Sequence, residues 1–312
     1  MTIASEAMTE APARATPTAP RTLPVARLFC WSVRRELWEN RSLYIAPLAA
    51  AAVMLLGFLL GAHRTLVSMP GLDPALQARG LARPYDAAAG VIMFTALIVA
   101  VFYCLGALHN ERRDRSILFW KSLPVSDLVT VLSKASVPLV VLPLISFAII
   151  IATGLVMIVL STVILLLNGM SVIPLWTQLP LVQMSLVVLY GLAVISLWYA
   201  PIYGWLLLVS AWARRAAFLW ALLPPLALCV VEKIAFDTSH VWGLIAYRFG
   251  GFTDAFNHGA FSRRGQAAGV TDPLAQVDLA GFLATPGLWA GLAVAAAFLA
   301  AAVWLRHRRE PL

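Results

Sequence analysis

Charged and aromatic side chains gather in one short stretch of an otherwise apolar chain, "ERRDRSILFWKSLPVSD" at residues 111–127. Its first five residues are all charged, and Phe119 and Trp120 end the aliphatic run that follows. Such a mixture is suited to recognition, with ionic and apolar contacts to a partner protein or to the bilayer surface. A solvated loop that carries ordinary positive charges is the alternative interpretation.

A second group of aromatic and hydroxyl side chains lies around Pro201. Tyr190, Trp198, Tyr199 and Tyr203 fall within fourteen residues of an apolar segment. Hydroxyl groups in such segments ordinarily serve helix packing. The cluster would also suit a pathway for an amphipathic substrate.

Patterns for catalysis are missing from the chain. A phosphate-binding P-loop requires G-x-x-x-x-G-K-[ST], and the only lysines, Lys121, Lys134 and Lys233, follow Trp, Ser and Glu. The five histidines are scattered, without an H-E-x-x-H or a G-x-S-x-G motif. We therefore expect no enzyme, and no cofactor or metal held by this chain. The apolar segments also lack an ionisable group near their centres, which disfavours an ion-coupled carrier.

The composition decides which elements must position these residues. The chain has 312 residues, of which 61% are hydrophobic and 12% charged, and its mean hydropathy is +0.83. A soluble domain is typically about a quarter charged, so most of this surface must face lipid. Three unpaired cysteines, Cys30, Cys104 and Cys229, suit apolar fillers rather than disulfides. The net charge of +8 is expected to orient the chain in a membrane, not to bind nucleic acid.

Six segments are long and apolar enough to cross the hydrocarbon layer, which takes about twenty helical residues. The predicted spans are about 43–62, 87–108, 135–167, 181–212, 216–232 and 286–305. The third and fourth exceed the length of one span but are too short for two. Pro138, Pro143 and Pro201 are expected to kink them, because proline cannot complete the helical hydrogen-bond ladder.

The distribution of basic residues predicts the orientation. With both termini in the cytoplasm, the inner segments hold 16 of the 23 Lys and Arg residues, and the outer loop at 168–180 holds none. Cationic residues resist translocation, so this arrangement is favoured. Residues 1–24, rich in Ala, Thr and Pro, are expected to be a disordered cytoplasmic tail, and residues 25–312 form the transmembrane domain.

Three elements outside the spans are predicted. Residues 25–42 show apolar positions at helical spacing, typical of a helix in the cytoplasmic interface. After the second span, Pro124 should end a short cytoplasmic helix, and Ser126 or Asp127 should cap the helix that enters the third span. On the outside, residues 233–285 should contain two short amphipathic helices broken at Gly250-Gly251.

The segment "ERRDRSILFWKSLPVSDLVTVLSK" resembles the membrane subunits, or permeases, of ABC-2-type ATP-binding-cassette transporters. That family shares its acidic-basic pair, its aliphatic run, "LPVS" and the Lys at the start of the next helix. The resemblance also covers the architecture: an interface helix, six spans and an external excursion between spans five and six.

The resemblance implies an all-α integral membrane protein whose residues 111–124 form a coupling helix that docks into an ATPase subunit. The contacts it implies are Glu111, Arg112, Arg115, Phe119 and Trp120, and the family's external helices correspond to about 237–258. It further implies a dimer with a second permease copy or paralogue and with two separate ATPase subunits, which would bind ATP and Mg²⁺.

The expected function is therefore export of a lipophilic or amphipathic compound across a bacterial inner membrane. The alternative is a mechanical or signalling membrane subunit that uses an ATPase without transporting anything.

Overall fold

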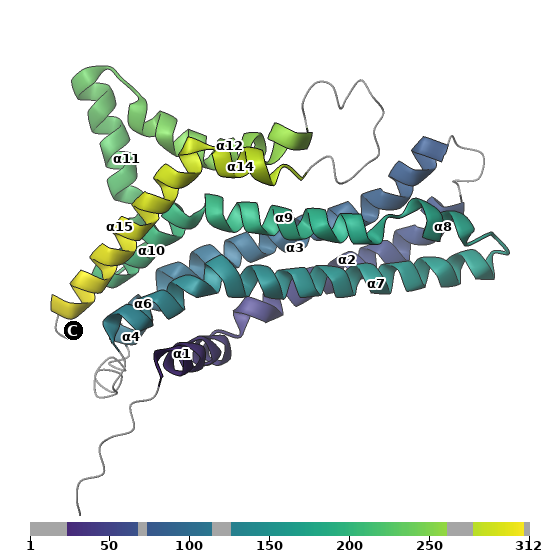
Figure 1. Ribbon diagram of the computed structural model, residues 1–312, viewed down its shortest axis with the longest axis horizontal. Coiled ribbons are helices and arrows are strands. Elements are labelled where there is room, and N and C mark those ends of the chain that lie inside the picture. The colour runs from purple at the N-terminus through teal and green to yellow at the C-terminus, as the bar shows by residue number, and fades with distance from the viewer. Residues whose placement is uncertain (1–23, 68–73, 114–125, 261–276, 309–312) are drawn as a thin grey trace, which may run out of the picture.

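The computed structural model describes residues 24–67, 74–113, 126–260 and 277–308, and within these ranges the fold is all helical (Figure 1). The helices are α1 (Val25–Glu39), α2 (Ser42–Val67), α3 (Pro74–Ala107), α4 (His109–Arg113), α6 (Asp127–Ser136), the π-helical turn η1 (Val137–Val141), α7 (Leu142–Leu167), α8 (Ile173–Gln178), α9 (Leu181–Trp198), α10 (Ala200–Trp212), α11 (Ala217–Phe236), α12 (His240–Ala260), α14 (Leu279–Ala284) and α15 (Pro286–Arg308). This confirms the predicted all-α class for the described residues.

Six helical stretches in these ranges are long and apolar enough to cross a membrane, by length and composition. They are Ser42–Ala62, Gly80–Glu111, Asp127–Leu167, Leu181–Trp198, Ala217–Phe236 and Pro286–Arg308. Each corresponds to one predicted span. Many of their large apolar side chains lie on the outer surface of the molecule, as expected of a multi-pass protein whose solvent is lipid.

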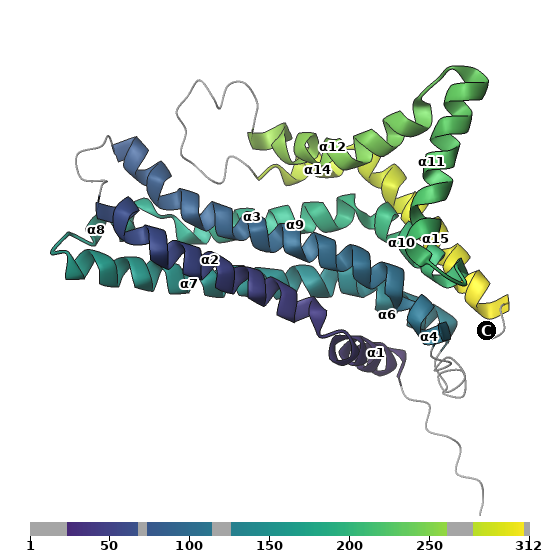
Figure 2. The ribbon, with the colours of Figure 1, turned by 180° about the vertical axis from the view of Figure 1, so that it is seen from behind.

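The long helices form two connected groups. Helices α2, α3 and α7 pack together along their lengths, and α9 joins them beside α7 (Figures 1 and 2). Helix α10 packs extensively on α15 and also against α3, which links the groups. Helix α1 is seen nearly end-on in Figure 1 while the long helices run across the picture, so it lies crosswise to them, against α6.

The third span is longer than predicted, because α6, η1 and α7 form one helical run from Asp127 to Leu167. The predicted irregularity is present at Pro138, which lies in the π-helical turn, where the amide of Leu142 bonds to the carbonyl of Val137. A proline has no amide hydrogen and its ring crowds the preceding turn, so the ladder shifts locally. The run continues instead of breaking.

The fourth predicted span, 181–212, is two helices. Helix α9 ends at Trp198, and α10 begins at Ala200 with Pro201 in its first turn. Pro201 cannot donate to the carbonyl of Leu197, so the helix stops and restarts around Tyr199. Only α9 reaches the length of a span, and α10 is a shorter apolar helix. The predicted kink at Pro201 is thus a full break.

The external region also differs from the prediction, because α12 runs through Gly250-Gly251 as one helix. A Cβ atom at Gly251 would lie 3.0 Å from the ring of Trp198 and 3.2 Å from Tyr247. Glycine at this position therefore permits close packing on α9 rather than breaking the helix. Residues 261–276 of the predicted external loop lie outside the described residues.

The corner between α11 and α12 is held by local hydrogen bonds. The carboxylate of Glu232 accepts bonds from the backbone amides of His240 and Val241, at 2.7 and 2.8 Å, at the start of α12. Lys233 pairs with Asp237 at 2.6 Å. Helix α11, which leads up to this corner, stands apart from the bundle in both views and has few buried side chains (Figures 1 and 2).

Candidate functional site: a buried charge network

Ionisable side chains from four helices meet where α1, α4, α6 and the end of α15 gather (Figure 1). We call this group the charge network; its members are Arg35, Glu36, Glu111, Asp127, Lys134 and Arg306. The members span most of the chain, since Glu111 and Arg306 are 195 residues apart. Folding therefore brings together α1, the two helices on either side of residues 114–125, and the end of α15.

Glu111 lies at the centre of the charge network, with only 7% of its surface exposed. Its Oε1 atom is 3.1 Å from Nζ of Lys134 and 3.0 Å from the guanidinium of Arg35. Its Oε2 atom accepts a hydrogen bond of 2.9 Å from Nη1 of Arg306. One carboxylate thus connects α4 to α1, α6 and α15.

Glu36 is the second buried carboxylate, and like Lys134 it is 1% exposed. Nζ of Lys134 donates to its Oε1 at 2.7 Å, and the hydroxyl of Tyr103 in α3 donates to its Oε2 at 2.9 Å. Arg35 donates to the same carboxylate at 3.0 Å. The crosswise helix α1 is therefore fastened to α3 and α6 by charged bonds.

The third carboxylate, Asp127, opens α6. Nε of Arg306 donates to its Oδ1 at 2.9 Å. The preceding Ser126 caps α6, because its hydroxyl oxygen accepts the backbone amide of Val129 at 3.3 Å. The predicted start of this helix is confirmed. An aspartate there also interacts favourably with the positive end of the helix dipole.

The charges within the network balance, with three cations against three carboxylates. Balance matters because an unpaired buried charge is costly, whereas a paired one roughly breaks even against apolar residues of the same size.

Glu39, at the exposed rim of α1, lies 3.4 Å from Arg35. Partial burial raises its pKa above the ordinary value, against the opposing effect of Arg35. In the described part of the chain, no cluster of three or more His, Cys, Asp or Glu could hold a metal ion.

The predicted docking residues are described only in part. Glu111 is buried in the charge network, and Arg112 lies in α4, where the structure gives its backbone alone. Arg115, Phe119 and Trp120 lie outside the described residues. The network contains Glu111 just before residues 114–125 and Asp127 just after them, so both flanks of this segment are fixed to the bundle.

The predicted pathway residues lie together in the core, and each is at most 8% exposed. The indole nitrogen of Trp198 donates to the carbonyl of Arg248 at 3.0 Å, and the hydroxyl of Tyr199 donates to that of Phe249 at 3.5 Å. The hydroxyl of Tyr190 donates to the carbonyl of Asp278 at 3.0 Å, and Tyr203 is buried in the same core. These contacts fasten α12 and the start of α14 to α9.

Sequence reasoning did not predict that Glu36 and Arg306 belong to a site. For Glu36 a signal exists, since it lies seven residues after Phe29 and three after Val33 and so falls beside the apolar stripe of α1. A carboxylate beside such a stripe requires a buried partner. For Arg306 no local signal exists, because a basic residue at the end of a span is ordinary.

Comparisons of this chain with protein-family models, with curated proteins and with solved structures found no match.

Proposed function

We propose that the chain is the permease subunit of an ATP-binding-cassette transporter of the ABC-2 type, which exports a lipophilic or amphipathic compound. In this proposal a separate ATPase docks on residues 111–124, two permease subunits face each other in the bacterial inner membrane, and both termini are cytoplasmic. ATP and Mg²⁺ are bound by the ATPase. The six apolar helices and the missing P-loop support this division of labour.

The observation that carries the proposal is the position of Glu111 in the charge network. A docked ATPase would pull on residues 111–124, whose flanks are joined to α1, α6 and α15 through Glu111 and Asp127. Helix α6 continues into the third span, and α15 is itself a span. A displacement at the docking segment would therefore be passed to two spans and to the crosswise helix α1.

The docking step is tested by capture of the ATPase. The permease, with Phe119 and Trp120 both replaced by Ala, is co-expressed with the ATP-binding-cassette ATPase encoded beside its gene, and the complex is isolated. We expect capture to fall strongly, because buried aromatic residues dominate protein interfaces. The matched control replaces Ile173 and Trp176, two exposed apolar residues of α8, which lies at the end of the bundle away from α4 and α6. Equal capture by both variants contradicts the docking site.

Transport is tested separately from docking. The complex is reconstituted in vesicles, and the ATP-dependent movement of a panel of amphipathic dyes is measured. Export that requires ATP and intact Phe119 and Trp120 supports the permease. Assembly and ATP turnover that respond to no compound favour the mechanical or signalling subunit instead. Movement that persists with an inactive ATPase contradicts both.

A further inference from the structure

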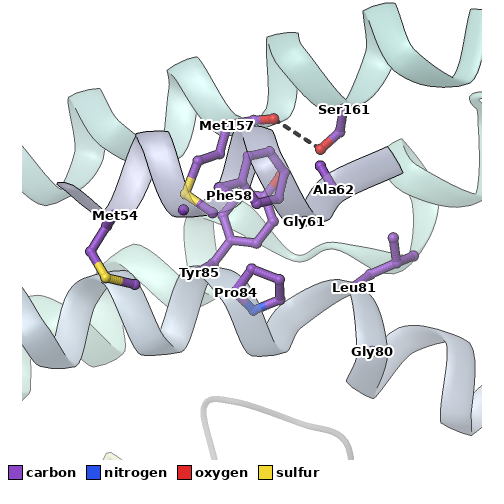
Figure 3. Close-up of a pocket in the computed structure, with 11 residues that line it drawn as sticks. Met54, Phe58, Gly61, Ala62, Gly80, Leu81, Pro84, Tyr85, Met157 and Ser161 are labelled. Carbon is purple, nitrogen blue, oxygen red and sulfur yellow. Dashed lines mark hydrogen bonds between the residues drawn. The ribbon is translucent and has the colours of Figure 1, made fainter. Parts of the chain in front are cut away.

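A cavity of about 250 Å³ lies between α2, α3 and α7, in the half of the bundle away from the charge network (Figures 1 and 3). Its walls are almost entirely apolar, with Met54, Phe58, Leu81, Pro84 and Met157 among them. The volume is far larger than the share of one water, about 30 Å³. It falls just below the range of about 300–1,000 Å³ for sites that hold drug-sized ligands. One segment of a hydrocarbon chain, or one ring, would fill it.

Two hydroxyl groups, from Tyr85 and Ser161, face the cavity (Figure 3). Ser161 donates to the carbonyl of Met157 at 2.9 Å. Tyr85 is 8% exposed, and its hydroxyl makes no hydrogen bond of ordinary geometry with any described residue, although Ser161 lies beside it. A buried hydroxyl in apolar surroundings is costly without a partner. The Tyr85 hydroxyl is therefore available to donate to an acceptor on a bound molecule.

The cavity reaches the outer surface of α2 at Gly57, an exposed residue of its lining. A Cβ atom built at Gly57 would meet nothing within 4 Å, so the glycine leaves open space where any other residue would place a side chain. Gly57 belongs to the candidate span Ser42–Ala62, whose exposed side chains are apolar in this part, as at Leu56 and Leu60. Entry is consequently from the lipid side.

The depth of Tyr85 indicates which acceptor would meet it. The predicted second span begins at about residue 87, so Tyr85 lies two residues before it, or about 3 Å along the helix. The polar interface on each side of a bilayer is about 5–8 Å thick. The Tyr85 hydroxyl therefore lies near the boundary between headgroups and hydrocarbon, where the ester carbonyls of glycerolipids are found.

We propose that this cavity binds an acyl chain of a membrane glycerolipid, whose ester carbonyl accepts a hydrogen bond from Tyr85. The chain fills the apolar space between α2, α3 and α7, and the headgroup remains outside. An ester suits the site better than a free carboxylate, because the described lining residues include no cation to compensate a buried charge. This site does not depend on the proposed transport function.

The test uses the purified protein in lipid nanodiscs that contain phosphatidylcholine with a photoactivatable diazirine midway along one acyl chain. After illumination, the modified peptides are identified by mass spectrometry. We expect adducts on the peptides that line the cavity, from α2, α3 and α7. In Gly57→Leu the new Cβ atom meets no neighbour, and we expect the side chain to close the opening and these adducts to disappear. The matched control is Gly90→Leu in α3, an exposed position that also has open space around it and lies outside the cavity.

A second variant, Tyr85→Phe, keeps the ring and removes only the hydroxyl. Competition with unlabelled lipid should show affinity about two- to twelvefold weaker, the effect of one hydrogen bond. A diazirine-bearing free fatty acid is tested in parallel. Adducts that are absent in the wild type, that persist in Gly57→Leu, or that vanish equally in Gly90→Leu overturn the proposal. So does affinity unchanged in Tyr85→Phe, or labelling of the cavity by the fatty acid in preference to the lipid.

Discussion

The charge network predicts that two damaging substitutions should compensate each other. Lys134→Met removes a cation that contacts two carboxylates, Glu36 at 2.7 Å and Glu111 at 3.1 Å. Glu111→Gln removes the carboxylate shared by Lys134, Arg35 and Arg306. Each single variant leaves one unbalanced buried charge, and the double variant restores neutrality.

The magnitude follows from the burial of the pair. Lys134 and Glu111 have side chains exposed by only 2% and 8%, and removing one partner of such a pair costs about 3–5 kcal/mol. At about 2 °C per kcal/mol, a conservative figure for a long chain, each single variant should unfold about 6–10 °C earlier. The double variant should recover a coupling energy of about 1–3 kcal/mol, since the two groups touch.

The assay is thermal unfolding in detergent, followed by intrinsic tryptophan fluorescence at a fixed heating rate. Lys233→Met is the control, because its pair with Asp237 is exposed, by 62% and 91%, and should contribute less than about 1 kcal/mol. Losses below about 1 kcal/mol in both single variants, with strictly additive effects in the double, would refute the account of a balanced buried network.

Three further variants test other contacts. Gly291→Ala should displace the end of the Arg248 side chain, which occupies the space of the new methyl group, and losing its hydrogen bond to the carbonyl of Gly287 should cost about 0.5–1.5 kcal/mol. Gly90→Ala, in open space, should cost less, and thermal unfolding measures both. Ser210→Ala should cost about 1–3 kcal/mol in the same assay, since its buried hydroxyl accepts two backbone amides after α3 at 3.0 and 2.9 Å. Ser126→Ala should cost about 0.5–2 kcal/mol, and hydrogen exchange should rise first in the opening turn of α6.

The arrangement of spans could be predicted because it depends on composition and length. Lipid requires long apolar helices, and these are visible as uninterrupted runs in the sequence. At Tyr199 the sequence predicts only a kink, whereas the structure has a break. A proline in a span can produce a kinked helix or two separate helices, and the sequence does not distinguish them. The uninterrupted course of α12 was not predictable, because two consecutive glycines ordinarily indicate a helix break. Only the structure shows that Gly251 packs closely against the ring of Trp198.

The candidate site could be predicted less well than the fold. Glu111 was predicted as a docking contact, which stays a prediction, and its burial depends on partners that only tertiary packing supplies. Lys134 was expected merely as part of a motif at a helix start. Its two carboxylate partners come from α1 and α4, and no local pattern says which helices will be neighbours. The docking role of residues 111–124 stays a prediction.

The participation of α15 in the charge network has a consequence for biosynthesis. Arg306 is translated 195 residues after Glu111, so five of the six ionic members are in place long before the last cation arrives. Until then two cations face three carboxylates, so the buried cluster carries an excess negative charge. The nascent protein should therefore be loosely packed and sensitive to proteases. Synthesis of α15 would thus complete the ion pairs of the charge network and stabilise the packing of the helices made before it.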